Sequence, residues 1–93
     1  MALRYKLHLE ALNKLLKIAK GIFYICDLNN HVIRRMDTDG QVTTFAGTGI
    51  PGDEIGPIEK AQFNGPIGLT IDAVGNIYVV ENRNNKIKVI RPS

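Results

Sequence analysis

The chain has little of what marks a catalytic centre, a disulfide framework or a metal site. Its 93 residues include one cysteine, two histidines and no tryptophan. A single cysteine excludes an internal disulfide, and Cys26 lies in the apolar run 22–26, which favours a small buried residue over a nucleophile. Neither His8 nor His31 has a second His, Cys or carboxylate at ligand spacing. We therefore expect no enzyme, no cofactor and no metal.

The sequence also has no apolar run long enough to cross a membrane. Its N-terminus starts with positive charge, but polar residues interrupt the apolar stretch that a signal peptide needs, and no small-residue cleavage site follows. Residues 1–20 hold five basic side chains and one acidic one, a net charge of +4, whereas residues 21–93 carry a net charge of −1. The basic balance therefore belongs to the N-terminal segment and is weak evidence for a nucleic-acid partner of the body.

One unit of sequence occurs twice, 54 residues apart. Residues 21–36 read GIFYICDLNNHVIRRM, residues 75–90 read GNIYVVENRNNKIKVI, and the two align without a gap. Identical or chemically similar residues recur at the same places, among them Gly21/Gly75, Tyr24/Tyr78, Asp27/Glu81, Asn30/Asn84 and Ile33/Ile87. A constant offset of this size indicates a repeated supersecondary unit.

Each copy has the pattern of a β-hairpin. A β-branched and aromatic run (22–26; 77–80) is followed by an Asn-rich break and a second such run (32–36; 86–90). Asn tolerates left-handed backbone angles, so the break predicts a turn. Further strands are expected at 42–46, after the turn residues Asp39-Gly40, and at 67–72. Six short strands predict an antiparallel meander, and strands repeated at this period are typical of the blades of a β-propeller.

The residues of the first copy resemble a known family. Residues 24–33, YICDLNNHVI, are similar to the NHL repeat signature, in which an apolar strand ends in Asp and a turn carries Asn-His-x-Ile. The second copy differs by Glu81 in place of Asp and Asn85 in place of His. Residues 44–49 and 61–69 resemble the long inter-blade connection of one NHL subgroup, although Ile55-Gly56 stands where that subgroup has Asp-Gly.

The resemblance covers residues 21–93 and implies a fold. It implies a partial β-propeller of NHL-type antiparallel blades, with three strands of one blade and three of the next, out of about six blades in a closed ring. The first blade then lacks its inner strand and the second its outer strand. Structural roles in the two turns are expected for Asp27, Asn30, His31, Glu81, Asn84 and Asn85. Asp27 and Glu81 are expected to cap their turns by accepting backbone N–H bonds.

Two other motifs favour turns over ligand sites. The segment GTGIPG at 47–52 spells a dinucleotide-binding pattern, but Gly56 and Pro57 break the helix that should receive the pyrophosphate. The segment DTDG at 37–40 resembles the start of a calcium loop, yet no later acid completes the coordination. Both are interpreted as turns.

Residues 1–20 form a separate N-terminal extension in this interpretation. Leu3, Tyr5, Leu7 and Leu9 alternate as in a strand, whereas the apolar residues from Leu9 to Ala19 follow helical spacing. We predict a short amphipathic α-helix that packs on the sheet. The alternatives are a surrogate for the missing inner strand, or sequence foreign to the propeller.

The function predicted from the resemblance is non-catalytic: a scaffold segment that binds a protein or peptide and self-associates, for example by completing a ring of about four chains. One alternative is an RNA-binding face, with Arg34, Arg35, Lys86 and Lys88 as the candidate interaction surface, although no aromatic stacking partners interleave them. Another is a piece of an NHL-type lyase propeller. Fold alone does not choose among them.

Overall fold

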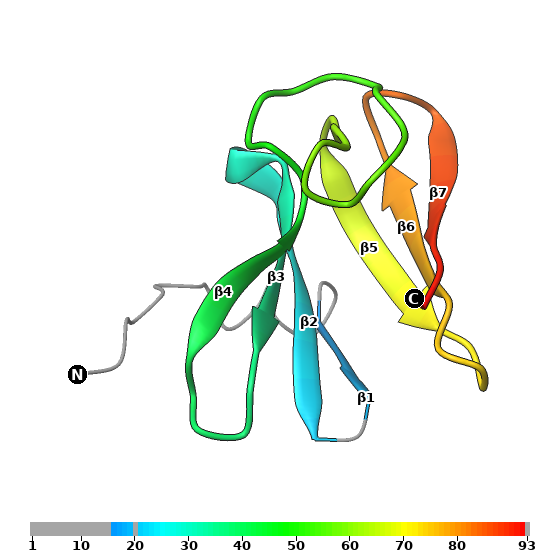
Figure 1. The fold of residues 1–93 in the computed structure, drawn as a ribbon. Coiled ribbons are helices and arrows are strands. Elements are labelled where there is room, and N and C mark those ends of the chain that lie inside the picture. Colours follow the sequence, from blue (N-terminus) through cyan, green and yellow to red (C-terminus); the bar gives the residue numbers. More distant parts are fainter. Residues whose placement is uncertain (1–15, 20, 93) are drawn as a thin grey trace.

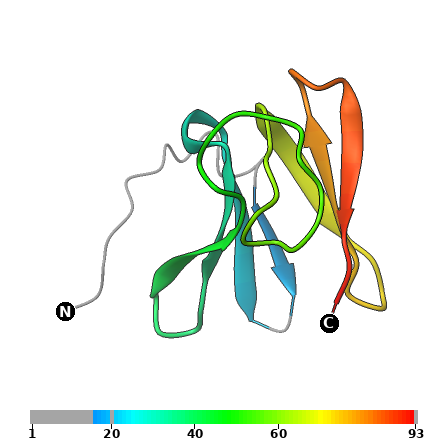
Figure 2. The ribbon, with the colours of Figure 1, turned by 45° about the horizontal axis from the view of Figure 1, so that its top comes forward.

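The computed structural model describes residues 16–19 and 21–92, and these residues form two antiparallel sheets, one packed against a face of the other (Figures 1 and 2). The elements in chain order are β1 (Leu16–Ala19), β2 (Ile22–Asp27), the 3-10 turn η1 (Leu28–Asn30), β3 (Val32–Met36), β4 (Val42–Ala46), β5 (Pro66–Ile71), β6 (Ile77–Glu81) and β7 (Lys86–Ile90). The all-β class and the predicted body strands are therefore confirmed, with bounds shifted by one residue at most.

The first sheet has four strands in the order β1-β2-β3-β4. Its first strand corrects the prediction of a helix, because residues 16–19 pair with β2 in antiparallel register, Leu16 opposite Ile25 and Ala19 opposite Ile22. The free edge of β2 supplies ladder partners that a helix could not use, and this tertiary pairing overrides the helical spacing of the leucines. The surrogate inner strand, the first of the alternatives, is what the structure shows at these four residues. The rest of the predicted helix lies outside the described residues.

The second sheet repeats the first with three strands in the order β5-β6-β7. In β6 and β7 the residue pairs Val79↔Lys88 and Glu81↔Lys86 stand opposite each other, 54 residues after the pairs Ile25↔Arg34 and Asp27↔Val32 of the first sheet. Because side chains alternate along a strand, each row of opposite residues shares one face of its sheet. The register therefore assigns each paired strand residue to a face.

The core lies between the two sheets. One face of the first sheet contributes Cys26, Ile33 and Ala46, and the facing side of the second contributes Leu69, Ile77, Val79 and Ile90, all at most 8% exposed. Residues 47–65 join β4 to β5 in a long loop that arches over the end of both sheets (Figure 1). The loop inserts the fully buried ring of Phe63 into this core, so it is a packed part of the fold.

Candidate functional site

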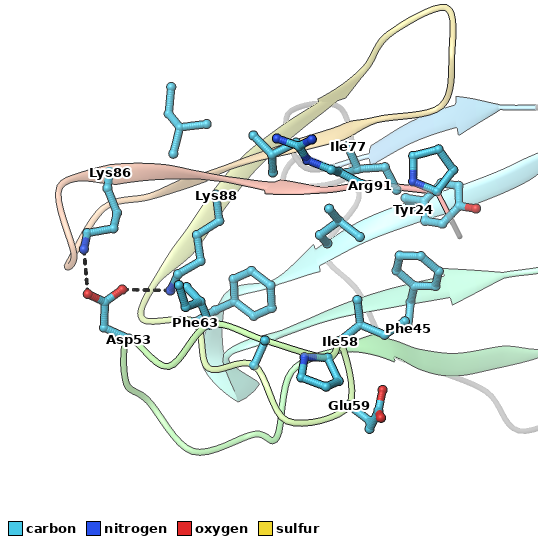
Figure 3. Close-up of a pocket in the computed structure, with 18 of the residues that line it drawn as sticks. Tyr24, Phe45, Asp53, Ile58, Glu59, Phe63, Ile77, Lys86, Lys88 and Arg91 are labelled. Carbon is cyan, nitrogen blue, oxygen red and sulfur yellow. Dashed lines mark hydrogen bonds and ion pairs between the residues drawn. The ribbon is translucent and has the colours of Figure 1, made fainter.

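An apolar groove of about 1080 Å³ opens between β7, the loop and the first sheet. Figure 3 shows Tyr24 and Phe45 on the side of the first sheet, Ile58 and Phe63 from the loop, and Ile77 from the second sheet. The rings of Tyr24 and Phe45 pack edge to face, with 5.1 Å between their centroids. The groove has aromatic and aliphatic walls, which suits an apolar ligand group.

The groove is charged at the end where β7 begins. Asp53, in the loop, forms ion pairs with Lys86 at 2.6 Å and with Lys88 at 2.9 Å (Figure 3). The hydrogen bonds from the two lysines hold the pKa of Asp53 below its usual value, and the hydrogen bond to Asp53 raises the pKa of Lys86. These contacts tie the loop to the first residues of β7.

Lys88 is the most tightly held charge at the site. Its ammonium group donates to Glu81 Oε1 at 3.0 Å and to the backbone oxygen of Gln62 at 2.7 Å, in addition to its contact with Asp53. It also lies 5.3 Å from the centre of the Phe63 ring. Three acceptors match the three N–H donors of an ammonium group, so the buried charge is fully satisfied.

The polar contacts of Glu81 repeat those of Asp27. Asn30 Nδ2 donates to Asp27 Oδ2 at 3.0 Å, and Arg34 Nε donates to the same oxygen at 3.0 Å. In the second sheet Asn84 Nδ2 donates to Glu81 Oε1 at 2.8 Å, and Lys88 takes the place of the arginine. An acid at a strand end, an Asn in the turn and a base in the next strand therefore form one unit that occurs twice.

The donors to these acids differ from the predicted caps. Asp27 makes no side-chain capping bond to the turn that follows it, because its carboxylate is engaged by Asn30 and Arg34. Glu81 does accept a backbone N–H, at 3.0 Å, but from Asn64 in the loop, 17 residues earlier in the chain. Each carboxylate also accepts from a charged side chain of the next strand, Arg34 for Asp27 and Lys88 for Glu81, and a charged donor gives a stronger bond than a backbone amide.

The two turns have left-handed residues at the same place. His31 has φ 55° and Asn85 has φ 51°, again 54 residues apart. His31 Nδ1 accepts the backbone N–H of Gly65 at 3.2 Å, which ties the first turn to the end of the loop. Asn85 is exposed at its own turn. His31 therefore has a connecting role that its counterpart lacks.

The four basic residues of the candidate interaction surface do not share one exposed patch. Arg34 and Lys88 expose only 13% and 10% of their side chains and lie in ion pairs. Arg34 and Arg35 are adjacent in β3 and so point to opposite faces of the first sheet. Lys86 is half exposed and bound to Asp53.

The glycine-rich segment and the Asp39-Gly40 turn have local structural partners. Gly47 donates its backbone N–H to Ile58 at 2.9 Å, and Gly52 donates to Phe63 at 3.2 Å, so the loop uses these amides internally. Asp37 Oδ1 accepts the backbone N–H groups of Asp39 and Gln41. Among residues 16–19 and 21–92, no three His, Cys, Asp or Glu side chains group as metal ligands, and no helix could span a membrane.

Cys26 lies in the core between the sheets, 1% exposed. Desolvation by this burial raises the pKa of its thiol to about 12. Because the thiolate is the reactive form, the side chain acts as a small apolar core residue.

Comparison with known proteins supports an NHL-like segment in this chain. The chain matches no protein-family model. It is 36% identical over 74 residues to NHL repeat-containing protein 2 of Bos taurus, which covers 76% of the chain and 10% of that protein. It is 37% identical over 71 residues to Protein SUPPRESSOR OF QUENCHING 1, chloroplastic, of Arabidopsis thaliana, which covers 75% of the chain and 7% of that protein. The chain thus spans a tenth or less of either relative, and it contains an NHL-like segment.

Proposed function

We propose that the chain is a segment of an NHL-type β-propeller, and that the groove beside β7 binds an extended stretch of a protein or peptide partner as an added β-strand. The NHL-like segment, the two antiparallel sheets and the 54-residue repeat support the first part. Strand addition to a sheet edge combines backbone hydrogen bonds with pockets for alternate side chains.

The observation that carries the proposal is the difference between β3 and β7. In the first sheet β3 lies between β2 and β4, whereas β7, its counterpart in the repeat, pairs only with β6 within the described residues. The apolar groove lies directly along this free edge. Backbone N–H and C=O groups at a sheet edge are a template for another strand.

The first sheet also defines how the added strand is expected to sit. β4 runs antiparallel to β3, with Val42 opposite Met36 and Thr44 opposite Arg34. Fifty-four residues later, Ile90 and Lys88 take the places of Met36 and Arg34. An added strand in this register places one side chain beside Ile90 and another beside Lys88, both on the face that lines the groove.

The walls of the groove select the chemistry of that strand. Beside Ile90 the groove presents Tyr24, Phe45 and Ile58, so an aliphatic or aromatic side chain gains burial there. Beside Lys88 the ammonium is already satisfied by three acceptors, so a small side chain such as Thr fits without a new ion pair. The expected ligand is an extended peptide with an apolar residue two positions from a small one.

A peptide with the sequence of residues 41–46, QVTTFA, tests the proposal because it copies the strand that covers β3. Added to the 15N-labelled full chain, it is expected to shift the β7 amide resonances saturably. The Ile58→Asp substitution in the groove wall should weaken binding about tenfold or more, since it places a charge where an apolar side chain binds.

Ile50→Asp is the matched control, because Ile50 is an exposed isoleucine of the same loop outside the groove. A scrambled peptide controls for non-specific association. Unchanged β7 resonances at millimolar peptide would refute the proposed site, and so would equal effects of the two substitutions.

A further inference from the structure

The end of the long loop is an Asn-Gly pair that hydrogen bonds hold against the second sheet. Asn64 is the one asparagine of the sequence that is followed by glycine. The backbone oxygens of Asn64 and Gly65 accept the N–H groups of Arg83 at 3.3 Å and Asn82 at 2.9 Å, in the turn between β6 and β7. The N–H of Asn64 donates to Glu81 Oε1 at 3.0 Å. The pair therefore docks the loop on this hairpin.

The fold favours glycine at the second position of the pair. Gly65 has φ 68°, and a Cβ at this residue would lie only 3.2 Å from Arg83 Cγ. Asn-Gly is also the dipeptide in which the backbone nitrogen most readily attacks the preceding side-chain amide, because glycine places no side chain beside that nitrogen. The fold thus holds a chemically reactive dipeptide at the point where the loop meets the second sheet.

A base lies on the nitrogen that would attack. His31 Nδ1 accepts the backbone N–H of Gly65 at 3.2 Å, which is within the reach of about 2.6–3.2 Å that general-base catalysis needs. Among the described residues, no donor reaches Asn64 Oδ1, although this atom is buried. A buried polar atom without a partner is rare in native proteins, and a reactive site is one reason for it. No hydrogen bond to this oxygen holds the side-chain amide away from the Gly65 nitrogen.

We propose that Asn64 and Gly65 form a site of intramolecular cyclisation, with His31 as the base, at which Asn64 is converted to aspartate or isoaspartate. The Gly65 nitrogen attacks Asn64 Cγ while its proton passes to His31 Nδ1. The N–Cγ bond forms, the Cγ–Nδ2 bond breaks, and the amide leaves as ammonia after taking the proton back from the imidazole. Water then opens the succinimide ring at either carbonyl. The reaction consumes one water molecule and needs no oxidant, cofactor or partner.

The product would loosen the end of the loop. Either ring opening places a new carboxylate next to Glu81, whose side chain is 0% exposed, and like charges in such a site repel. Isoaspartate also adds an atom to the backbone between residues 64 and 65, which shifts the oxygen that Asn82 binds. Because the neighbouring Phe63 is a fully buried core residue, we expect the modified chain to melt at a lower temperature.

Incubation of the folded full chain at neutral pH, followed by peptide mapping with mass spectrometry, tests the inference. Asn64 is expected to lose ammonia and then to appear as aspartate and isoaspartate, while Asn82 and Asn84 stay unchanged. His31→Asn is the matched variant, since the second unit has Asn85 at the same place with φ 51°. An amide is no base, so this variant should react at Asn64 about tenfold more slowly or less.

Two controls separate the base from other effects. In urea the unsubstituted chain and His31→Asn should react at the same rate, because unfolding removes residue 31 from the Gly65 nitrogen. Asn64→Gln should abolish the product, since glutamine would have to close a larger ring. Circular dichroism shows whether each variant is folded, and His31→Gly, which adopts positive φ without strain, gives a second variant without the base.

An unmodified Asn64 in the folded chain would overturn the proposal. So would an equal or higher rate in either folded His31 variant, because it would mean that the hydrogen bond to His31 protects the Gly65 nitrogen and does not activate it. A rate difference that persists in urea would also contradict the role given to His31.

Discussion

Strands β2 and β3 of the first sheet and β6 and β7 of the second pair in the same register, and each hairpin ends in an acid, an Asn and a left-handed residue. Their surroundings differ. The first sheet has a fourth strand on β3 and the second sheet on one face. Among the described residues, β7 has no strand on its outer edge, and the face of the second sheet that carries Val80 and Ile87 has no sheet against it. A repeated sequence thus fixes the local geometry of each unit, but neighbours decide what its surfaces contact.

The comparison also separates residues that look equivalent in the alignment. Ile33 and Ile87 have the same side chain and the same place in the hairpin, yet one is fully buried and the other is 61% exposed. His31 and Asn85 share their backbone angle, yet only His31 is seen to hold the loop. Four measurements test this difference between the two units.

The largest effect is expected from Lys88, the buried base of the second unit. Lys88→Met leaves Glu81, whose side chain is 0% exposed, without its charged donor, and should lower the free energy of unfolding by about 3–5 kcal/mol. Urea denaturation measures it. Lys86→Met is the control at a half-exposed pair and should cost much less, because solvent screens that pair. Equal losses would contradict the role given to burial.

Ile33 and Ile87 give the cleanest test of unequal surroundings. Ile33→Ala removes a fully buried side chain and should cost about 2–5 kcal/mol, as core truncations do. Ile87→Ala removes a side chain that is already 61% exposed and should cost under about 1 kcal/mol. Comparable losses would contradict the exposure of Ile87, because they would mean that its face of the second sheet is covered.

The two left-handed turn residues should respond differently to glycine. Glycine adopts positive φ without strain, so Asn85→Gly is expected to change the free energy of unfolding by less than about 1 kcal/mol. His31→Gly relieves the same strain but deprives the Gly65 N–H of its acceptor, which should cost about 1–3 kcal/mol. Thermal melting of the two variants decides, and identical shifts would mean that the bond from Gly65 contributes nothing.

A smaller effect is expected on the loss of stability at low pH, and it comes from Asp72 in the second unit. The carboxylate of Asp72 accepts hydrogen bonds from the side chains of Asn76 and Tyr78, and the hydrogen bond from Asn76 is the main cause that lowers the pKa of Asp72. The first unit has Ile18 at the equivalent position, 54 residues earlier. A lowered pKa gives stabilisation that is present above the unfolded value of about 3.9 and is lost as the pH falls through the folded value. Between pH 6 and pH 3, the melting temperature of the Asp72→Asn variant should therefore fall less steeply than that of the unsubstituted chain. Parallel plots of melting temperature against pH would contradict this.

The sequence predicted the strands of the body because the alternation and turn signals there are local. Asp39-Gly40 and the Asn-rich breaks specify their turns through the backbone angles they permit, and the structure places hairpins at each. It predicted a helix at 16–19 because the leucine spacing is a local signal, and only the free edge of β2 makes a strand of those residues.

The groove could not be predicted in the same way. Asp53 meets Lys86 and Lys88 from 33 and 35 residues away, and no spacing rule connects a loop carboxylate to a distant strand. Phe63 likewise has no periodic pattern that marks it as core. Contacts that depend on how a long loop folds back require the three-dimensional structure.

Amide hydrogen exchange at β3 and β7 tests the central claim most directly. If β7 is a free edge, only the amides that pair with β6 are protected, so protection should alternate along Lys86–Ile90, whereas protection along Val32–Met36 should be continuous because both neighbours are present. Continuous protection along β7 in the free chain would contradict the account, because it would mean that another strand already occupies the edge.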